Sequence, residues 1–288
     1  MEKTSNLTQL SIIYSEETKN VPLVSVVVTT KNEEKNIENC LKSVRNQTLK
    51  KIQLIVVDNF SSDKTAEMAK KYLAEVYFKG NERSAQRNYG AKVASGEYLL
   101  YLDADMILSS TLVEECVEKC RRYQVDALYI PERIVGKGFW IKVRDFERSF
   151  YTGTIIDAVR FIRRDLFLQV GGFDETLVGP EDWDFDRKIR KLGQTAVISQ
   201  PLFHNEGQFN LKHYLRKKGY YTEGIQRYIK KYGHDDQETM KQTGVSYRLI
   251  GVFIEKGNWK KVICHPLLTF GLYFLRINVA LEYLRRRN

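Results

Sequence analysis

The stretch Glu97-Tyr-Leu-Leu-Tyr-Leu-Asp-Ala-Asp-Met106 is the part of this sequence that decides the fold. Its apolar and aromatic residues predict a buried strand, and a strand covered on both faces usually belongs to a parallel sheet flanked by helices. Asp103 and Asp105 end the run, and isolated carboxylates are very costly to bury. We therefore expect them at the carboxyl end of the sheet, where open α/β sheets bind ligands. Strand alternation would point both the same way, as a clamp for a divalent cation and its phosphates.

Two earlier strands have the same form. The run Leu23–Thr30 ends in hydroxyl residues, and the run Ile52–Val57 is followed by Asp58. A helical pattern follows each run, and this alternation predicts a doubly wound, mostly parallel α/β sheet. The three strand ends, with Arg87 from the next expected helix, offer groups that suit a nucleotide and its phosphates. No glycine-rich phosphate loop follows the first strand.

The remaining elements are expected from periodicity and turn residues. Further strands are expected at residues 74–78, 126–130, 155–162 and 195–199, and helices at residues 64–72, 83–94, 181–192 and 209–232. A helix that ends near residue 122 should be capped by Ser109 or Ser110. Residues 136–138 and 233–244 are expected to be loops.

The composition favours an anionic partner. The 288 residues carry 46 Lys and Arg against 36 Asp and Glu, a formal net charge of +10, which suits nucleic acid, a phosphorylated substrate or an acidic membrane surface. The four cysteines show no disulfide or zinc spacing, and the first twenty residues lack the apolar core of a signal peptide, so we expect a cytoplasmic protein. We divide the chain into a polar arm (1–20), a catalytic domain (21–205) and a helical extension (206–288).

The apolar stretch Val262–Leu281 has two interpretations. His265, Pro266 and Arg276 interrupt it, which argues against a helix that spans the membrane. It could be an interfacial helix, peripheral at the cytoplasmic face of a membrane, with lysines before it and arginines after it to meet anionic lipid. It could equally dock on the protein's own core.

The candidate site residues also have structural interpretations. Asp58 could be a turn or cap residue, and Arg87 could lie on a solvated helix face. Asp182, in the acidic start of a helix, could be a general base or could only compensate the helix dipole. His204 could coordinate a cation or touch phosphate, or it could simply be packed.

Six short motifs occur together in a recognisable order. They are Val-Val-Val-Thr-Thr-Lys-Asn-Glu (26–33), Val-Val-Asp-Asn-Phe-Ser-Ser-Asp (56–63), Gln-Arg-Asn-Tyr-Gly (86–90), Tyr-Leu-Asp-Ala-Asp (101–105), Gly-Gly-Phe-Asp-Glu (171–175) and Glu-Asp-Trp-Asp (181–184). In this combination the chain resembles the inverting, nucleotide-sugar-dependent glycosyltransferases of family 2. The resemblance covers about residues 22–204 and implies a GT-A fold, a Rossmann-like mixed, mostly parallel sheet flanked by helices.

The resemblance also implies roles. Asp182 would be the catalytic base, Mn²⁺ or Mg²⁺ would bind at Asp103 and Asp105, and His204 would lie near the metal or diphosphate. The implied donor is a nucleoside-diphosphate sugar, with UDP favoured and GDP possible, and the implied acceptor is a lipid-linked or cell-surface glycan. Asn59 stands where many relatives have a second aspartate. The implied donor-site residues are Thr29, Thr30, Glu33, Asp58, Asn59, Arg87 and Asp103, and those of the acceptor or sugar region are Gly172, Glu181 and Trp183.

Two other functions compete with this interpretation. A sugar-nucleotide pyrophosphorylase would usually carry a glycine-rich basic loop where this chain has Thr-Thr-Lys-Asn-Glu-Glu (29–34). A non-enzymatic module that binds nucleic acid would explain the charge, but the sequence has no nucleic-acid motif and we expect no nucleic acid partner.

Overall fold

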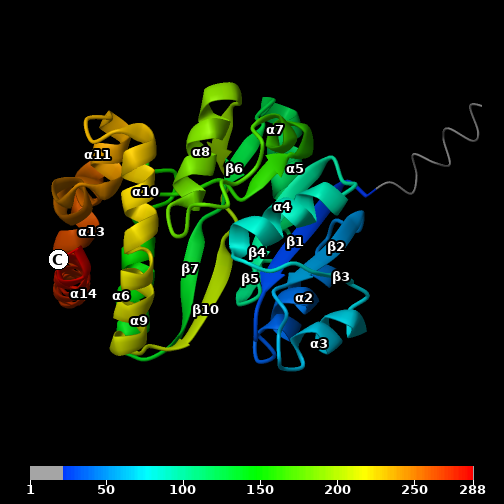
Figure 1. The fold of residues 1–288 in the computed structure, drawn as a ribbon, viewed down its shortest axis with the longest axis horizontal. Coiled ribbons are helices and arrows are strands. Elements are labelled where there is room, and N and C mark those ends of the chain that lie inside the picture. Colours follow the sequence, from blue (N-terminus) through cyan, green and yellow to red (C-terminus); the bar gives the residue numbers. More distant parts are fainter. Residues whose placement is uncertain (1–21, 288) are drawn as a thin grey trace, which may run out of the picture.

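A computed structural model describes residues 22–287, so the predicted polar arm lies outside the described residues. A seven-stranded sheet in the order β3-β2-β1-β4-β8-β6-β9 forms the centre (Figure 1). Its parallel half consists of β1 (Val24–Thr30), β2 (Ile52–Asp58), β3 (Glu75–Phe78) and β4 (Tyr98–Asp103). In the other half, β8 (Phe161–Arg163) runs antiparallel to β4 and to β6 (Ala127–Tyr129), and β9 (Thr195–Val197) is parallel to β6.

Helices cover both faces of this sheet. One core cluster joins it to α2 (Ile37–Arg45), α3 (Thr65–Lys71) and α5 (Leu112–Tyr123), and a second joins it to α4 (Arg83–Val93), α7 (Arg164–Gln169) and α8 (Glu181–Leu192). Alternation along β1 explains why one strand serves both clusters. Val26 and Val28 enter the first and Val27 the second, and all three are fully buried. The predicted mixed, mostly parallel sheet flanked by helices is confirmed.

A second, three-stranded sheet lies beside the first. It contains β5 (Met106–Leu108), β10 (Leu202–Gln208) and β7 (Glu132–Lys137). None of these strands was predicted, because each is short or polar and is defined by its partners rather than by its own pattern. The predicted boundary after residue 205 falls within β10, and the division into domains stays a prediction.

The C-terminal helices pack against the outer side of this second sheet, at the opposite end of the molecule from β2 and β3 (Figure 1). The helix α6 (Phe139–Arg148) precedes them in the chain and joins a third apolar cluster with α12 (Val252–Ile254) and α14 (Pro266–Arg287). The elements after β10 are α9 (Leu211–Tyr220), α10 (Thr222–Tyr232), α11 (Gln237–Thr243), η1 (Tyr247–Gly251), α12 (Val252–Ile254), η2 (Glu255–Gly257), α13 (Trp259–Cys264) and α14 (Pro266–Arg287).

Four local predictions were wrong. The loop expected at 136–138 instead contains the last two residues of β7. The strand expected at 155–162 covers only its last residues, because Asp157 instead closes a turn by accepting from the Gly153 backbone N–H at 2.8 Å. Neither Ser109 nor Ser110 caps α5: the separate strand β5 ends at Leu108, and the residue before the helix is Thr111, which makes no side-chain cap hydrogen bond. The loop expected at 233–244 contains α11, whose cap Asp236 accepts from the Thr239 backbone N–H at 2.9 Å.

The helix α14 has two different faces. Leu272 and Leu275 are buried in the third cluster, so the helix does dock on the protein, while Leu267 and Phe270 on other faces are each 75% exposed. Within the described residues, one helix, spanning residues 266–285, has the length and apolar composition to cross a membrane (mean hydropathy 1.3). About a fifth of that stretch (22%) is buried, and core helices share the same length and composition.

Candidate active site

The carboxyl ends of β1, β2 and β4 bring the predicted residues together. In the strand register, Thr30 lies beside Asp58 and Thr29 lies beside Asp103. The Thr29 hydroxyl donates to Asp103 Oδ1 at 3.1 Å. Asp58 also has its predicted turn role, since its Oδ1 accepts from the Ser61 backbone N–H at 2.6 Å. The three strand ends therefore form one polar edge, as parallel strands require.

Several buried polar atoms at this edge have no partner among the described residues. They include Thr30 Oγ1, Asp58 Oδ2, Asp105 Oδ1, Arg87 Nε and Glu181 Oε2, which are half of all such side-chain atoms in that part of the chain. Buried polar groups are normally hydrogen-bonded, and exceptions concentrate where a ligand, ion or water completes them. This concentration makes the edge the candidate ligand site.

Arg87 connects the edge of the sheet to the start of α8. Its Nη2 lies 3.2 Å from Asp103 Oδ1 and its Nη1 lies 2.6 Å from Asp182 Oδ1. The side chain is 1% exposed and its guanidinium lies 5.1 Å from the ring centre of Phe173. The solvated-face interpretation of Arg87 is therefore wrong. Burial opposes ionisation of Asp103, but Arg87 and Arg83 outweigh it and hold the pKa of Asp103 well below its usual range.

Arg83 is a site residue that the sequence prediction missed. It lies one turn before Arg87 on α4, and that spacing alone places both on one helix face. Its guanidinium lies 3.6 Å from Asp103 Oδ2 and 3.2 Å from Glu181 Oε1. Two arginines on α4 thus pair with three carboxylates, one at the end of β4 and two at the start of α8.

The two acids that begin α8 differ in their titration. Burial opposes ionisation of Asp182, but Arg87, Arg160 and Arg83 outweigh it and lower its pKa. Burial and the neighbouring Asp182 charge raise the pKa of Glu181. Asp182 is the more accessible of the two, with a side chain 33% exposed, whereas Glu181 is 2% exposed. Asp182 is therefore the ionised acid that a ligand can reach.

Asp105 and His204 form the other half of the site. The strand β4 ends at Asp103 and residues 104–105 form a turn before β5, so the strand alternation from which a common direction was expected does not extend to Asp105. His204 Nε2 lies 3.0 Å from Asp105 Oδ2, and its Nδ1 lies 2.9 Å from Glu132 Oε1. Burial lowers the pKa of His204, but these two hydrogen bonds raise it to about 10.

The donor atoms here suit a hard or borderline divalent cation. Asp105 has a carboxylate oxygen without a partner among the described residues, and His204 would supply Nε2 once a cation displaces the proton it shares with Asp105, with Glu132 orienting the ring as carboxylates commonly do for metal-ligating histidines. No group of three or more His, Cys, Asp or Glu in the described part of the chain is arranged to hold a metal alone. A cation at Asp105 would need further ligands, such as phosphate oxygens or water.

The other predicted residues surround this centre. Burial raises the pKa of Glu33, and the negative charges of Asp105 and Asp103 raise it further. Asn59 is tied to β1 through its backbone N–H, 2.9 Å from the Thr30 carbonyl. Gly172 has φ +68°, and a Cβ there would lie 2.5 Å from the Asn88 amide, so packing against α4 requires glycine.

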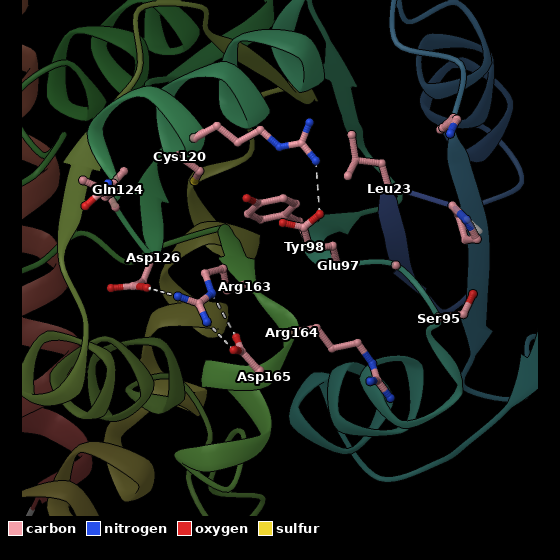
Figure 2. Close-up of a pocket in the computed structure, with 15 residues that line it drawn as sticks. Leu23, Ser95, Glu97, Tyr98, Cys120, Gln124, Asp126, Arg163, Arg164 and Asp165 are labelled. Carbon is pink, nitrogen blue, oxygen red and sulfur yellow. Dashed lines mark hydrogen bonds and ion pairs between the residues drawn. The ribbon is translucent and has the colours of Figure 1, made fainter. Parts of the chain in front are cut away.

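A cavity of about 1210 Å³ lies elsewhere, at the amino ends of the strands (Figure 2). Most of its charged side chains pair with one another, Arg163 with Asp126 at 2.8 Å and Arg121 with Glu97 at 3.2 Å, while Lys51 and Arg164 line it without an ion pair among the described residues. None of the predicted site residues lines this cavity, so the candidate site remains at the carboxyl ends.

Comparison with known proteins decides the family. The family model described as glycosyl transferase family 2 matches residues 25–171, which contain the three strand ends and four of the six motifs in full. The chain belongs to glycosyl transferase family 2. The predicted family and enzyme class are confirmed, and the match favours them over the pyrophosphorylase and the nucleic-acid module.

Similar proteins extend the comparison of this family 2 member. The uncharacterized glycosyltransferase EpsJ of Bacillus subtilis is 31% identical over 150 residues, half of this chain and 41% of EpsJ. The chain spans 41–63% of the length of the first curated relatives it matches. Crystalline S. aureus TarS 1–349 with UDP-GlcNAc has a TM-score of 0.57 at 17% identity, covering 90% of this chain and 89% of TarS. Mannosyltransferase PcManGT from Pyrobaculum calidifontis, with GDP-Man and Mn²⁺, has a TM-score of 0.57 at 19% identity, covering 91% and 75%. Both structures support the GT-A fold.

Proposed function

We propose that this family 2 member is a metal-dependent, inverting glycosyltransferase that moves a sugar from a nucleoside-diphosphate sugar to an acceptor hydroxyl. One observation carries the proposal: Arg87 lies between Asp103, at the end of β4, and Asp182, at the start of α8. The Arg87 guanidinium therefore contacts both the strand edge proposed for the nucleotide diphosphate and the accessible, ionised carboxylate of Asp182. A single-displacement transferase needs these two functions close together.

The donor nucleotide would lie across the ends of β1 and β2. The unpartnered atoms of Thr30 and Asp58 suit a base or ribose, and Asn59 and Glu33 extend the same edge. We favour UDP, with GDP as the alternative. TarS in complex with UDP-GlcNAc and PcManGT in complex with GDP-Man and Mn²⁺ support a nucleotide-sugar donor in this fold.

Asp105 and His204, with Asp103 nearby, would hold Mn²⁺ or Mg²⁺. Such a cation would act as a Lewis acid that neutralises charge on the leaving diphosphate. The unpartnered Asp105 oxygen supports this assignment.

The reaction would be one in-line step. Asp182 accepts the proton of the acceptor hydroxyl, whose oxygen forms the new bond to the anomeric carbon. The bond from that carbon to the diphosphate oxygen breaks, and the nucleoside diphosphate leaves with the electron pair. The sugar is transferred with inversion. Arg87 and Arg83 would orient the carboxylates and the diphosphate, and Glu181 and Trp183 would border the acceptor.

The acceptor is proposed to be a glycan carried on a lipid or a cell surface, reached from a membrane face. The segment α13–α14 supports this, because the exposed apolar residues of α14 recur every three or four positions, as on one helix face, and Ile263 on α13 precedes them. They are Ile263, Leu267, Phe270, Phe274, Ile277, Leu281 and Leu284. We call them the apolar stripe. Lys260 and Lys261 precede it, and Arg285 follows it, where they complement anionic lipid.

A donor panel tests the function. The protein is incubated with UDP- and GDP-sugars and Mn²⁺, and release of nucleoside diphosphate is measured with and without a chelator. Metal-dependent release from one donor is the expected result. Absence of release from every donor, or release that the chelator leaves unchanged, would contradict the metal-dependent proposal.

A further inference from the structure

A second charged cluster lies between the second sheet and the C-terminal helices. It includes four cationic side chains and two carboxylates, contributed by α6, β10, α9, η1 and α14. They are Arg144, Lys218, Arg248 and Arg276, with Glu147 and Glu206. We call these six residues the cationic cluster. Cations outnumber carboxylates by two, which is unusual for side chains that are partly or fully buried.

Arg144 and Arg276 together form ion pairs with both carboxylates of the cluster. Arg144 pairs with Glu147 and lies 2.9 Å from Glu206 through its Nη2. Arg276 Nε lies 3.1 Å from Glu147 Oε1. These pairs neutralise the two arginines and leave no carboxylate of the cluster for the remaining cations.

Lys218 and Arg248 are those remaining cations. Neither forms an ion pair with a carboxylate anywhere in residues 22–287; each instead lies over an aromatic ring. Lys218 Nζ is 5.5 Å from the ring centre of Tyr214, and the Arg248 guanidinium is 4.9 Å from that of Trp183. Both side chains are half-buried, so they lose solvation but remain within reach of a ligand. Partly buried cations without counter-charges favour binding of an anion.

The position of the cluster connects it to the reaction. Trp183, under Arg248, directly follows the proposed base Asp182. Glu206 follows His204 by two residues on β10. In the fold, α6, α9 and α14 lie on the far side of β7 and β10 from the nucleotide edge at β1 and β2 (Figure 1). An acceptor that approaches Asp182 from this side would pass the cationic cluster.

We propose that Lys218 and Arg248 bind a phosphate group of the acceptor, so that the acceptor of this enzyme is a phosphorylated molecule. The proposal rests on the proposed transferase function. It assigns the chemical class of the acceptor: an oxyanion placed beside the hydroxyl that Asp182 deprotonates. A charge-assisted hydrogen bond from each cation would hold the phosphate.

The titration of Lys218 agrees with this geometry. Burial, together with Arg144, Arg248 and Lys217, lowers the pKa of Lys218 to about 7, with Glu147 opposing the shift. Burial and Arg276 lower the pKa of Arg248 in the same way. A bound phosphate would supply the missing counter-charge. The groups that face Lys218 are Tyr214 and Lys217 on α9, Arg144 and Glu147 on α6, and Arg248 on η1.

Calorimetric titration with octyl phosphate tests the site, with octyl glucoside as the uncharged probe of the same chain length. Saturating UDP, GDP and Mn²⁺ are present throughout to occupy the donor site. We expect octyl phosphate to bind and octyl glucoside not to bind. The double variant Lys218→Met with Arg248→Met should weaken octyl phosphate binding at least about tenfold, since two charge-assisted contacts are lost. The Lys212→Met variant, which changes an exposed lysine on the same helix, should bind as the parent does.

Other results would overturn the proposal. Equal affinity of the parent and the double variant, or equal binding of the two probes, would remove the phosphate site. If the double variant does not fold, Lys218→Met alone must weaken binding and Lys218→Arg must restore it. Phosphatidylglycerol vesicles are also tested as competitors of octyl phosphate. If they compete for the parent but not for Lys218→Met, the anion at this site is a membrane headgroup and the acceptor assignment is refuted. Donor turnover is measured separately, so active transferase without octyl phosphate binding would reject this proposal alone.

Discussion

The Asp182→Asn variant tests whether Asp182 is the catalytic base of the active site. Asparagine has nearly the same shape and can still accept from Arg87 Nη1, which lies 2.6 Å from the carboxylate. It cannot take a proton from an acceptor hydroxyl. General base catalysis typically contributes about 10²- to 10⁴-fold, so transfer should fall by that factor. Arg87 keeps Asp103 as its partner and the Asp182 side chain is 33% exposed, so stability should fall by only about 1 kcal/mol.

Transfer to acceptor, donor affinity and thermal unfolding are measured in parallel on this variant. Donor affinity should stay close to that of the parent, because Asp182 is not a proposed ligand of the nucleotide. The matched control is Asp186→Asn, one turn later on α8, where the carboxylate is 1% exposed and lies 2.8 Å from Arg190. That control should lose stability but keep transfer within a few-fold of the parent. If Asp182→Asn transfers sugar within about tenfold of the parent rate, the base assignment is refuted.

Four further changes test other parts of the structure. Arg87→Met should cost about 3 kcal/mol of unfolding free energy, because two carboxylates lose their buried partner; a loss below about 1 kcal/mol in denaturant titrations would contradict this. Asp105→Ala should weaken Mn²⁺-dependent donor binding about tenfold or more, as measured by calorimetry with and without Mn²⁺. Unchanged donor affinity in this variant would mean that the metal binds elsewhere. Phe270→Glu should abolish co-sedimentation with phosphatidylglycerol vesicles, whereas Leu73→Glu, at a position 83% exposed outside the apolar stripe, should not; equal effects would reject the membrane face. As pH rises through about 7, Lys218→Arg should retain more octyl phosphate affinity than the parent, because Lys218 with its lowered pKa loses its charge and arginine does not; equal pH profiles of the two proteins would contradict this.

The parallel half of the sheet was predictable because its information is local. Each of its central strands is a continuous apolar run followed by polar residues, so the strands and their ends can be read without knowing any partner. Placing Thr29 beside Asp103 then follows from parallel pairing alone. The same reasoning located Asp58 and Arg87. Arg83 could also have been found, since it lies on the same face of α4, one turn earlier.

The second half of the site was not predictable from local patterns. Glu132 lies 72 positions before His204, and only the pairing of β7 with β10 brings the two together. Neither strand alternates in polarity enough to be recognised. Arg160 likewise lies within the stretch 155–162 that was expected to be a strand, whereas the observed strand begins only at Phe161, after the turn at Asp157. The carboxylate that orients the histidine thus depends on the assembled tertiary structure.

The arrangement of Arg87 also gives a physical reason why a base with a lowered pKa can act in this reaction. With no donor present, Arg87 divides its charge between Asp103 and Asp182, and this pairing makes Asp182 a weak proton acceptor. A donor diphosphate would place new negative charge beside the same guanidinium. If the diphosphate weakens the ion pair between Arg87 and Asp182, the pKa of Asp182 rises. Donor binding would then make Asp182 a stronger base just before the acceptor is deprotonated. Deprotonation of the acceptor without a bound donor would then be disfavoured, because both events depend on the one arginine.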